Sequence, residues 1–129
     1  MLKKLVLTLI SLSIANTAFA SEQCKLLEKE LDTENTLHYK TMVQQSIKKK
    51  INEKTIDITQ VLSESEWVAI SASTEISEPG VLFFKNNKFV DVWGGNVDPE
   101  DKPDVIKWAK NIHVPNKLSE CFYESIVLD

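Results

Sequence analysis

Hydrophobic and polar residues alternate along two segments that flank Asn86 and Asn87. Both segments, Val81–Lys85 and Lys88–Trp93, are rich in β-branched and aromatic residues, which are typical of β-strands. A two-residue hairpin loop requires positive φ angles, and asparagine tolerates this conformation better than most residues. The pattern therefore predicts a β-hairpin with Asn86 and Asn87 at its turn.

The expected register gives this hairpin two largely apolar faces. Counting outward from the turn yields these pairs: Lys85 with Lys88, Phe84 with Phe89, Phe83 with Val90, Leu82 with Asp91, and Val81 with Val92. One face then groups Phe84, Phe89 and Trp93 and is interrupted by Asp91. Two interpretations remain open: other elements cover both faces, or the aromatic face is exposed for a partner. The charge of Asp91 leads us to expect that the aromatic face is the less covered one.

Apolar residues at helical spacing predict three helices. A short first helix follows Ser21, which is a suitable N-cap. The second helix covers about Leu37–Asn52, where apolar residues recur every four positions. The third follows Asp98, and its regular part starts at Pro99 or Pro103, since proline is tolerated in the first turn.

Further strands are expected on both sides of the hairpin. Trp67–Thr74 alternates like a strand, and the acidic segment Glu75–Gly80 then forms a loop before the hairpin. Ile56–Leu62 fits either a strand or a helical turn. Cys121–Leu128 is rich in β-formers and is expected to be the last strand, although a helix starting at Asn116 is the alternative.

The expected order of elements is two helices, three strands, a helix and a strand. This order predicts an α+β fold: a small antiparallel sheet of about four strands, built around the central hairpin. We expect the helices to pack mainly on one face of the sheet.

The N-terminus has the pattern of a cleaved signal peptide over residues 1–20. Lys3 and Lys4 precede an apolar core over Leu5–Ile14, and a small-x-small cleavage pattern ends at Ala20. The core is too short to span a bilayer, which requires about 20 apolar residues. We therefore expect export to the periplasm or medium, with no stable membrane anchor.

Charge narrows the choice of partners for the single domain expected over residues 21–129. Removal of Lys3 and Lys4 reduces 15 basic residues to 13, against 19 acidic ones, so the formal charge becomes −6. An acidic domain is a poor candidate for binding nucleic acid or an anionic membrane surface. A basic protein partner would suit it better.

Two cysteines, Cys24 and Cys121, lie near opposite ends of this domain. In an oxidising compartment they are expected to form one disulfide. Closing such a long loop is worth about 4–5 kcal/mol in the chain-entropy description. A redox role would favour a Cys-x-x-Cys pair, and a metal site would require more ligands.

Candidate catalytic chemistry is sparse. Gly-x-Ser-x-Gly, His-Glu-x-x-His and phosphate-loop motifs are absent. His38 and His113 are interpreted as ordinary surface residues, Lys48–Lys50 as a solvated helix end, and Gly94 with Gly95 as the exit of a strand. We expect no enzymatic activity, cofactor or metal, although carboxylate pairs with suitable spacing remain open.

These observations favour an exported, non-enzymatic protein-binding domain of inhibitor or immunity type. The alternatives are an accessory subunit of an envelope assembly and a small carboxylate-dependent hydrolase. Acidic segments could complement a basic cleft, which raises association rate and selectivity. The candidate partner-binding residues are Phe84, Phe89, Trp93, Glu75, Glu78, Asp98 and Asp101.

Overall fold

The computed structural model describes residues 22–129, so the expected signal peptide lies outside the described residues. Residues 22–27 are helical. The elements that follow are α2 (Thr33–Ser46), η1 (Glu53–Thr55), β1 (Asp57–Glu64), β2 (Trp67–Thr74), β3 (Ser77–Lys85), β4 (Lys88–Gly94), η2 (Pro99–Asp101), α3 (Lys102–Asn111) and α4 (Asn116–Ile126). Within this described part, no helix is long and apolar enough to cross a membrane.

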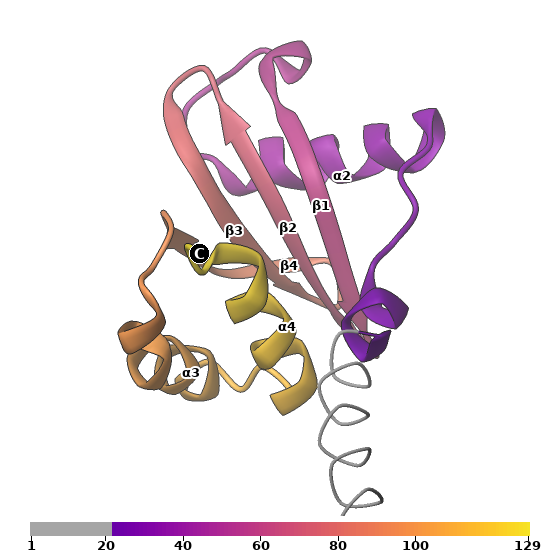
Figure 1. Cartoon of the computed structure of the whole chain (residues 1–129). Coiled ribbons are helices and arrows are strands. Elements are labelled where there is room, and N and C mark those ends of the chain that lie inside the picture. Colours follow the sequence, from indigo (N-terminus) through magenta and orange to yellow (C-terminus); the bar gives the residue numbers. More distant parts are fainter. Residues whose placement is uncertain (1–21) are drawn as a thin grey trace, which may run out of the picture.

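The four strands form one antiparallel sheet in the order β1-β2-β3-β4, so neighbours in sequence are neighbours in space. Helices α3 and α4 lie on one face of the sheet, and α2 crosses the other (Figure 1). The predicted α+β class with a four-stranded antiparallel sheet is confirmed.

The larger core lies between the sheet and helices α3 and α4. Phe83 of β3 and Phe122 of α4 are fully buried there, with their ring centroids 4.9 Å apart. Trp108 of α3 packs edge-on against Phe83 at 5.5 Å. Leu27 from the N-terminal helical segment joins the same cluster. The aromatic side chains therefore fix α3 and α4 against the centre of the sheet.

The smaller core lies under α2 on the opposite face. Val43 of α2 packs with Val61, Ile70 and Phe84 from three adjacent strands, all almost completely buried. Helix α2 packs chiefly on β1 and β2. Among residues 22–129, no helix therefore packs chiefly on the β3–β4 half of the same face.

The expected last strand over Cys121–Leu128 is wrong, and the alternative helix from Asn116 is correct. In α4, the buried residues Leu118, Phe122 and Ile126 recur every four positions and face the sheet. Burial of this stripe outweighs the β-propensity of its aromatic and branched residues. The fourth strand is instead β1, which includes most of the ambiguous segment.

The second helix starts and ends earlier than the expected Leu37–Asn52. Asp32 is its N-cap: the Asp32 carboxylate accepts from the Asn35 N–H, and the Asn35 side chain accepts from the Asp32 N–H, both at 2.8 Å. This capping box fixes the first turn. The helix stops at Ser46, so Lys48–Lys50 lie beyond it rather than in its last turns.

The acidic loop expected over Glu75–Gly80 is mostly strand. Thr74 pairs with Ser77, so only Glu75 and Ile76 form the turn between β2 and β3. The Thr74 and Ser77 hydroxyls are 2.8 Å apart and close this turn. The hairpin is tighter than the run of acidic, Pro and Gly residues indicated.

The predicted hairpin turn is correct, but its register is only partly so. Asn86 and Asn87 have φ angles of 52° and 64°. Phe84 pairs with Phe89 as expected, whereas a bulge follows, so Phe83 pairs with Asp91 rather than with Val90. The remaining corrected pairs are Leu82 with Val92 and Val81 with Trp93. An extra residue in one strand reverses the faces of all residues beyond it.

The predicted disulfide between Cys24 and Cys121 is confirmed. Its Cα atoms are 5.3 Å apart, and the residues are separated by 97 positions in sequence. The bond joins the N-terminal helical segment to α4, which replaces the strand expected at that position.

Candidate binding surfaces

Two hollows flank the end of the sheet at which β3 begins and β4 ends. An apolar groove opens on the α2 face, and a polar pocket opens on the α4 face. Glu78, Pro79, Gly80 and Gly95 line both hollows and separate them. The start of β3 is therefore a thin wall between two surfaces of different chemistry.

The apolar groove has a volume of about 480 Å³ and follows the half of the sheet that α2 leaves open. Its apolar side chains include Ile47, the C-cap of α2, Leu82 from β3, and Phe89 and Val92 from β4. Phe89 is 43% exposed and Val92 is 46% exposed. We call these four residues the docking face.

The β4 bulge creates the docking face by redistributing the side chains of the hairpin. It brings Val92 opposite Leu82, on the same face as Phe89. It also moves Trp93 to the α3–α4 core, where its ring lies 5.3 Å from that of Trp108. Trp93 is therefore separated from Phe89, contrary to the expected grouping.

Phe84 and Phe89 differ sharply in exposure although they pair across the hairpin. Phe84 is only 2% exposed and belongs to the core under α2. Its ring meets that of Phe89 edge-on at a centroid distance of 5.8 Å. Phe89 is thus an accessible extension of a rigid core, a suitable position for a binding anchor.

The outer edge of β4 is poorly suited to pairing with another strand. Within residues 22–129, β4 pairs only with β3. The Val92 N–H donates to the Asp91 carboxylate at 2.8 Å. A bulge and a charged side chain at an edge both oppose strand addition. The accessible apolar surface is therefore the face of β4 rather than its edge.

The acidic candidates fall into two groups. Glu78 is exposed and lines the groove, whereas Glu75 lies in the β2–β3 turn and accepts from the Asn52 N–H at 3.3 Å. Asp98 and Asp101 form a capping box at η2, with the Asp98 N–H donating to Asp101 at 3.0 Å. Glu78 therefore lies beside the docking face, whereas Asp98 and Asp101 cap the short helix η2.

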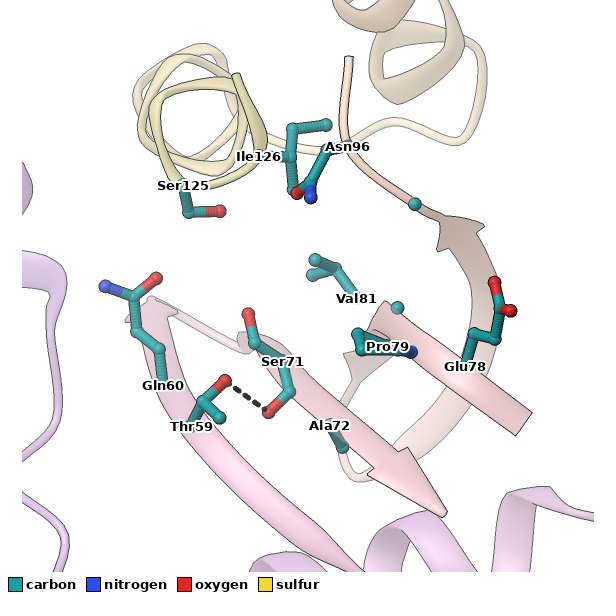
Figure 2. A pocket seen from close by; sticks show the side chains of 12 residues that line it. Thr59, Gln60, Ser71, Ala72, Glu78, Pro79, Val81, Asn96, Ser125 and Ile126 are labelled. Carbon is teal, nitrogen blue, oxygen red and sulfur yellow. Dashed lines mark hydrogen bonds between the residues drawn. The ribbon is translucent and has the colours of Figure 1, made fainter. Parts of the chain in front are cut away.

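The polar pocket has a volume of about 510 Å³ and lies between the sheet and the last turn of α4 (Figure 2). Gln60 and Ser71 are paired on β1 and β2, and Asn96 and Ser125 approach from the other side. This pocket was not predicted from the sequence. Ordinary polar residues from four separate segments meet there, and no local motif marks them.

The described residues contain no cluster of metal-binding side chains. Among residues 22–129, no group of three or more His, Cys, Asp and Glu side chains could hold a metal ion. His38 and His113 are both exposed. The ring centroids of His38 and Tyr39 are 5.7 Å apart. His113 follows α3 and has a φ angle of 70°.

Neither protein-family models, nor curated proteins, nor solved structures gave a significant match to this chain.

Proposed function

We propose that this protein is a non-enzymatic binding domain that captures a partner protein on the docking face. The observation that carries the proposal is the exposure of Phe89 and Val92 in an apolar groove beside the C-terminal end of α2. Contiguous apolar surface next to a concave site is typical of protein-interaction surfaces. The rigid core under Phe89 reduces the entropy lost on binding.

The partner is expected to present an apolar side chain with a Lys or Arg close to it. Among the described residues lining the groove, Glu78 is the only charged one. Because no lysine is among these lining residues, a cation next to Glu78 would be attracted by its carboxylate without repulsion from the lining, which favours a basic partner. Lys48–Lys50 follow Ile47 outside this lining and would select against a uniformly basic surface.

Export to an oxidising compartment forms part of the proposal. The signal-peptide pattern over residues 1–20 supports it, and a disulfide that staples the chain is typical of such compartments. An inhibitor or immunity-type role suits a small acidic domain with an apolar anchor. An accessory role in an envelope assembly would use the same surface.

The test compares partner capture by Phe89→Ala and Val92→Ala with capture by Leu37→Ala. Leu37 is 57% exposed on α2, so its loss removes a similar apolar side chain elsewhere. The oxidised protein would be the bait in a native extract. We expect capture to fall at least about tenfold in the first two variants, the effect of losing one anchor, and to persist in Leu37→Ala.

A photo-crosslinking side chain at position 92 would then identify the part of the partner in contact. Equal capture by all variants would refute the docking face. Crosslinks that form only from a probe at the control position 37 would also refute it. Loss of a partner's activity in the complex would favour inhibition over assembly, and retention of that activity would favour assembly.

A further inference from the structure

The polar pocket lies where the α4 face of β2 carries small side chains instead of a large one. On the α4 face, Trp67 and Ala69 belong to the core, and Ser71 follows them into the pocket. Helix α4 ends at Ile126, and Gly95 adds no side chain opposite it. The pocket therefore results from the small residues at these positions and from the end of α4, and not from the absence of a helix or strand.

Hydrogen-bonding groups from several segments of the chain converge on this space. The Thr59 hydroxyl donates to the Ser71 carbonyl at 3.4 Å, and the Ser125 hydroxyl donates within its own helix at 2.6 Å. In Figure 2, no hydrogen bond joins the side chains of Gln60, Ser71 or Asn96 to another of the residues drawn. Donors and acceptors on three sides of the pocket remain free for a ligand.

The charge and the apolar part of the pocket lining restrict the ligand further. Glu78 is the only charged side chain among the described residues that line it, so an anion would meet repulsion. Pro79 is exposed and supplies apolar surface in its lining, whereas the lining residues Val81 and Ile126 are buried. The matching ligand is uncharged, carries several hydroxyl or amide groups, and has one apolar face.

We propose that the polar pocket binds a short uncharged saccharide. A sugar ring has hydroxyls around its rim that can bond to Gln60, Ser71 and Asn96. Its C–H face can pack on the exposed ring of Pro79. The volume of about 510 Å³ lies in the range of small-molecule sites. This site opens on the other face of the sheet from the docking face, and the two hollows share the lining residues Glu78, Pro79, Gly80 and Gly95.

The first experiment titrates isotope-labelled protein with maltose, chitobiose and glucuronic acid by NMR. We expect saturable shifts in the backbone amides around Ser71 and Asn96 with one or both neutral sugars. Glucuronic acid should bind more weakly because its carboxylate approaches Glu78, and Glu78→Gln should reduce that difference. Absence of saturable shifts with both neutral sugars, or equal binding of glucuronic acid, would overturn the proposal.

Variants separate a built site from adventitious contact. Gln60→Leu and Ser71→Val should each weaken sugar binding about tenfold, because each removes hydrogen bonds and leaves a ligand hydroxyl unpaired. Gln45→Leu, on the exposed side of α2, is the matched control and should have no effect. Unchanged affinity in both pocket variants would refute the assignment. Phe89→Ala should leave sugar binding intact, so this test and the docking test can fail separately.

Discussion

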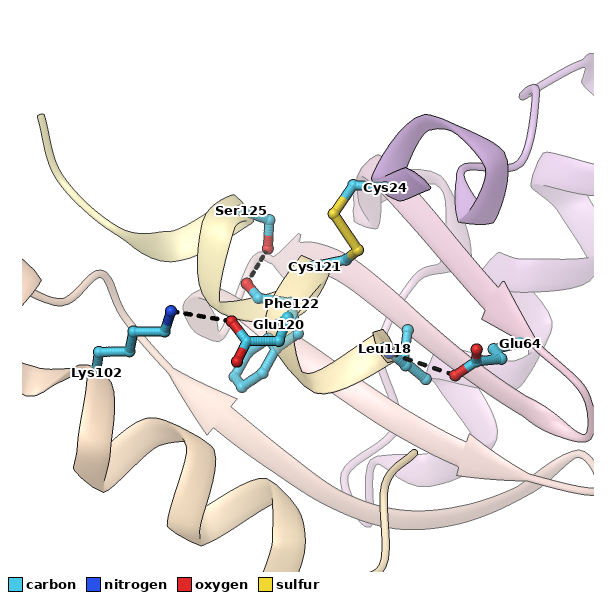
Figure 3. Close-up of a disulfide and its surroundings, with 8 residues drawn as sticks. All are labelled: Cys24, Glu64, Lys102, Leu118, Glu120, Cys121, Phe122 and Ser125. Carbon is cyan, nitrogen blue, oxygen red and sulfur yellow. Dashed lines mark hydrogen bonds and ion pairs between the residues drawn. A yellow bond between two sulfur atoms is a disulfide. The ribbon is translucent and has the colours of Figure 1, made fainter. Parts of the chain in front are cut away.

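The carboxylate of Glu64 accepts a hydrogen bond from the backbone N–H of Leu118, 54 residues further along the chain (Figure 3). The donor–acceptor distance is 3.3 Å. Leu118 lies in the first turn of α4, where backbone N–H groups lack partners within the helix. The N-cap Pro115 provides no side-chain bond. Strand β1 therefore supplies the cap that the helix itself lacks.

Loss of this cap should lower the free energy of unfolding. We expect Glu64→Ala to cost about 1 kcal/mol, the usual value of a capping interaction, and Glu64→Gln to cost less because it keeps an acceptor oxygen. Urea unfolding followed by circular dichroism measures both. Equal stability of Glu64→Ala and the wild type would show that water replaces the cap.

The disulfide between Cys24 and Cys121 should contribute much of the stability (Figure 3). It closes a loop over a sequence separation of 97 residues, for which chain entropy predicts about 4–5 kcal/mol. We expect the double Cys→Ser variant to lose stability of this order in urea. The reduced wild type should match it. A loss below about 1 kcal/mol would show that the contacts of the N-terminal segment already restrict the unfolded chain.

Truncation of Phe84 should destabilise the fold much more than truncation of Phe89. Phe84 is buried under α2, so Phe84→Ala should cost about 3–5 kcal/mol. Phe89 is 43% exposed, so Phe89→Ala should cost less than about 1 kcal/mol. Thermal and urea unfolding measure both. A cost for Phe89→Ala close to that of Phe84→Ala would make Phe89 a core residue and remove the main support for the docking face.

Tyr39 should ionise at higher pH than a free tyrosine. Its pKa is raised above 10.0, first by burial and second by the negative charge of Asp32. The protonated phenol is therefore favoured by the fold. Its contribution to stability is complete below pH 10.0 and is lost as the pH rises through the raised pKa. Phenolate absorbance, compared between the wild type and Tyr39→Phe, isolates this titration.

A variant at Asp32 tests the cause of this shift. Asp32→Asn keeps a good N-cap for α2 while it removes the charge. We expect the Tyr39 pKa to fall towards its ordinary value but to remain raised, since burial is the larger cause. A Tyr39 pKa that does not change in Asp32→Asn would assign the whole shift to burial.

The turn chemistry of the hairpin could be predicted, but its register could not. Asn86 and Asn87 both adopt the positive φ that the two-residue turn requires. Beyond Phe89, the sequence Val-Asp-Val-Trp fits two registers, because either one places apolar residues on both faces. Tertiary packing decides between them, because the observed register allows the Trp93 ring to pack against Trp108 in the aromatic core.

The residues around the two hollows could be predicted to different degrees. Phe89 and Glu78 were expected at a partner surface because they stand in the hairpin and beside it, and both line the groove. The expected grouping of Trp93 with Phe89 was wrong because the bulge in β4 shifts the register and turns Trp93 to the other face. The polar pocket depends on α4, whose residues have strong β-propensity, so Ser125 could not be placed opposite Ser71 before the helix was known.

Gly80 sets the spacing between β3 and β4 beside both hollows. A Cβ atom at this position would lie 2.9 Å from the backbone carbonyl oxygen of Trp93, which no side-chain rotation can relieve. Gly94, its partner across the two strands, has no atom within 4 Å of the corresponding position. We expect Gly80→Ala to cost about 1–3 kcal/mol through overpacking, and Gly94→Ala to have little effect. Urea unfolding of both variants measures the difference, and equal costs would show that β4 moves away freely and that the wall between the groove and the pocket is soft.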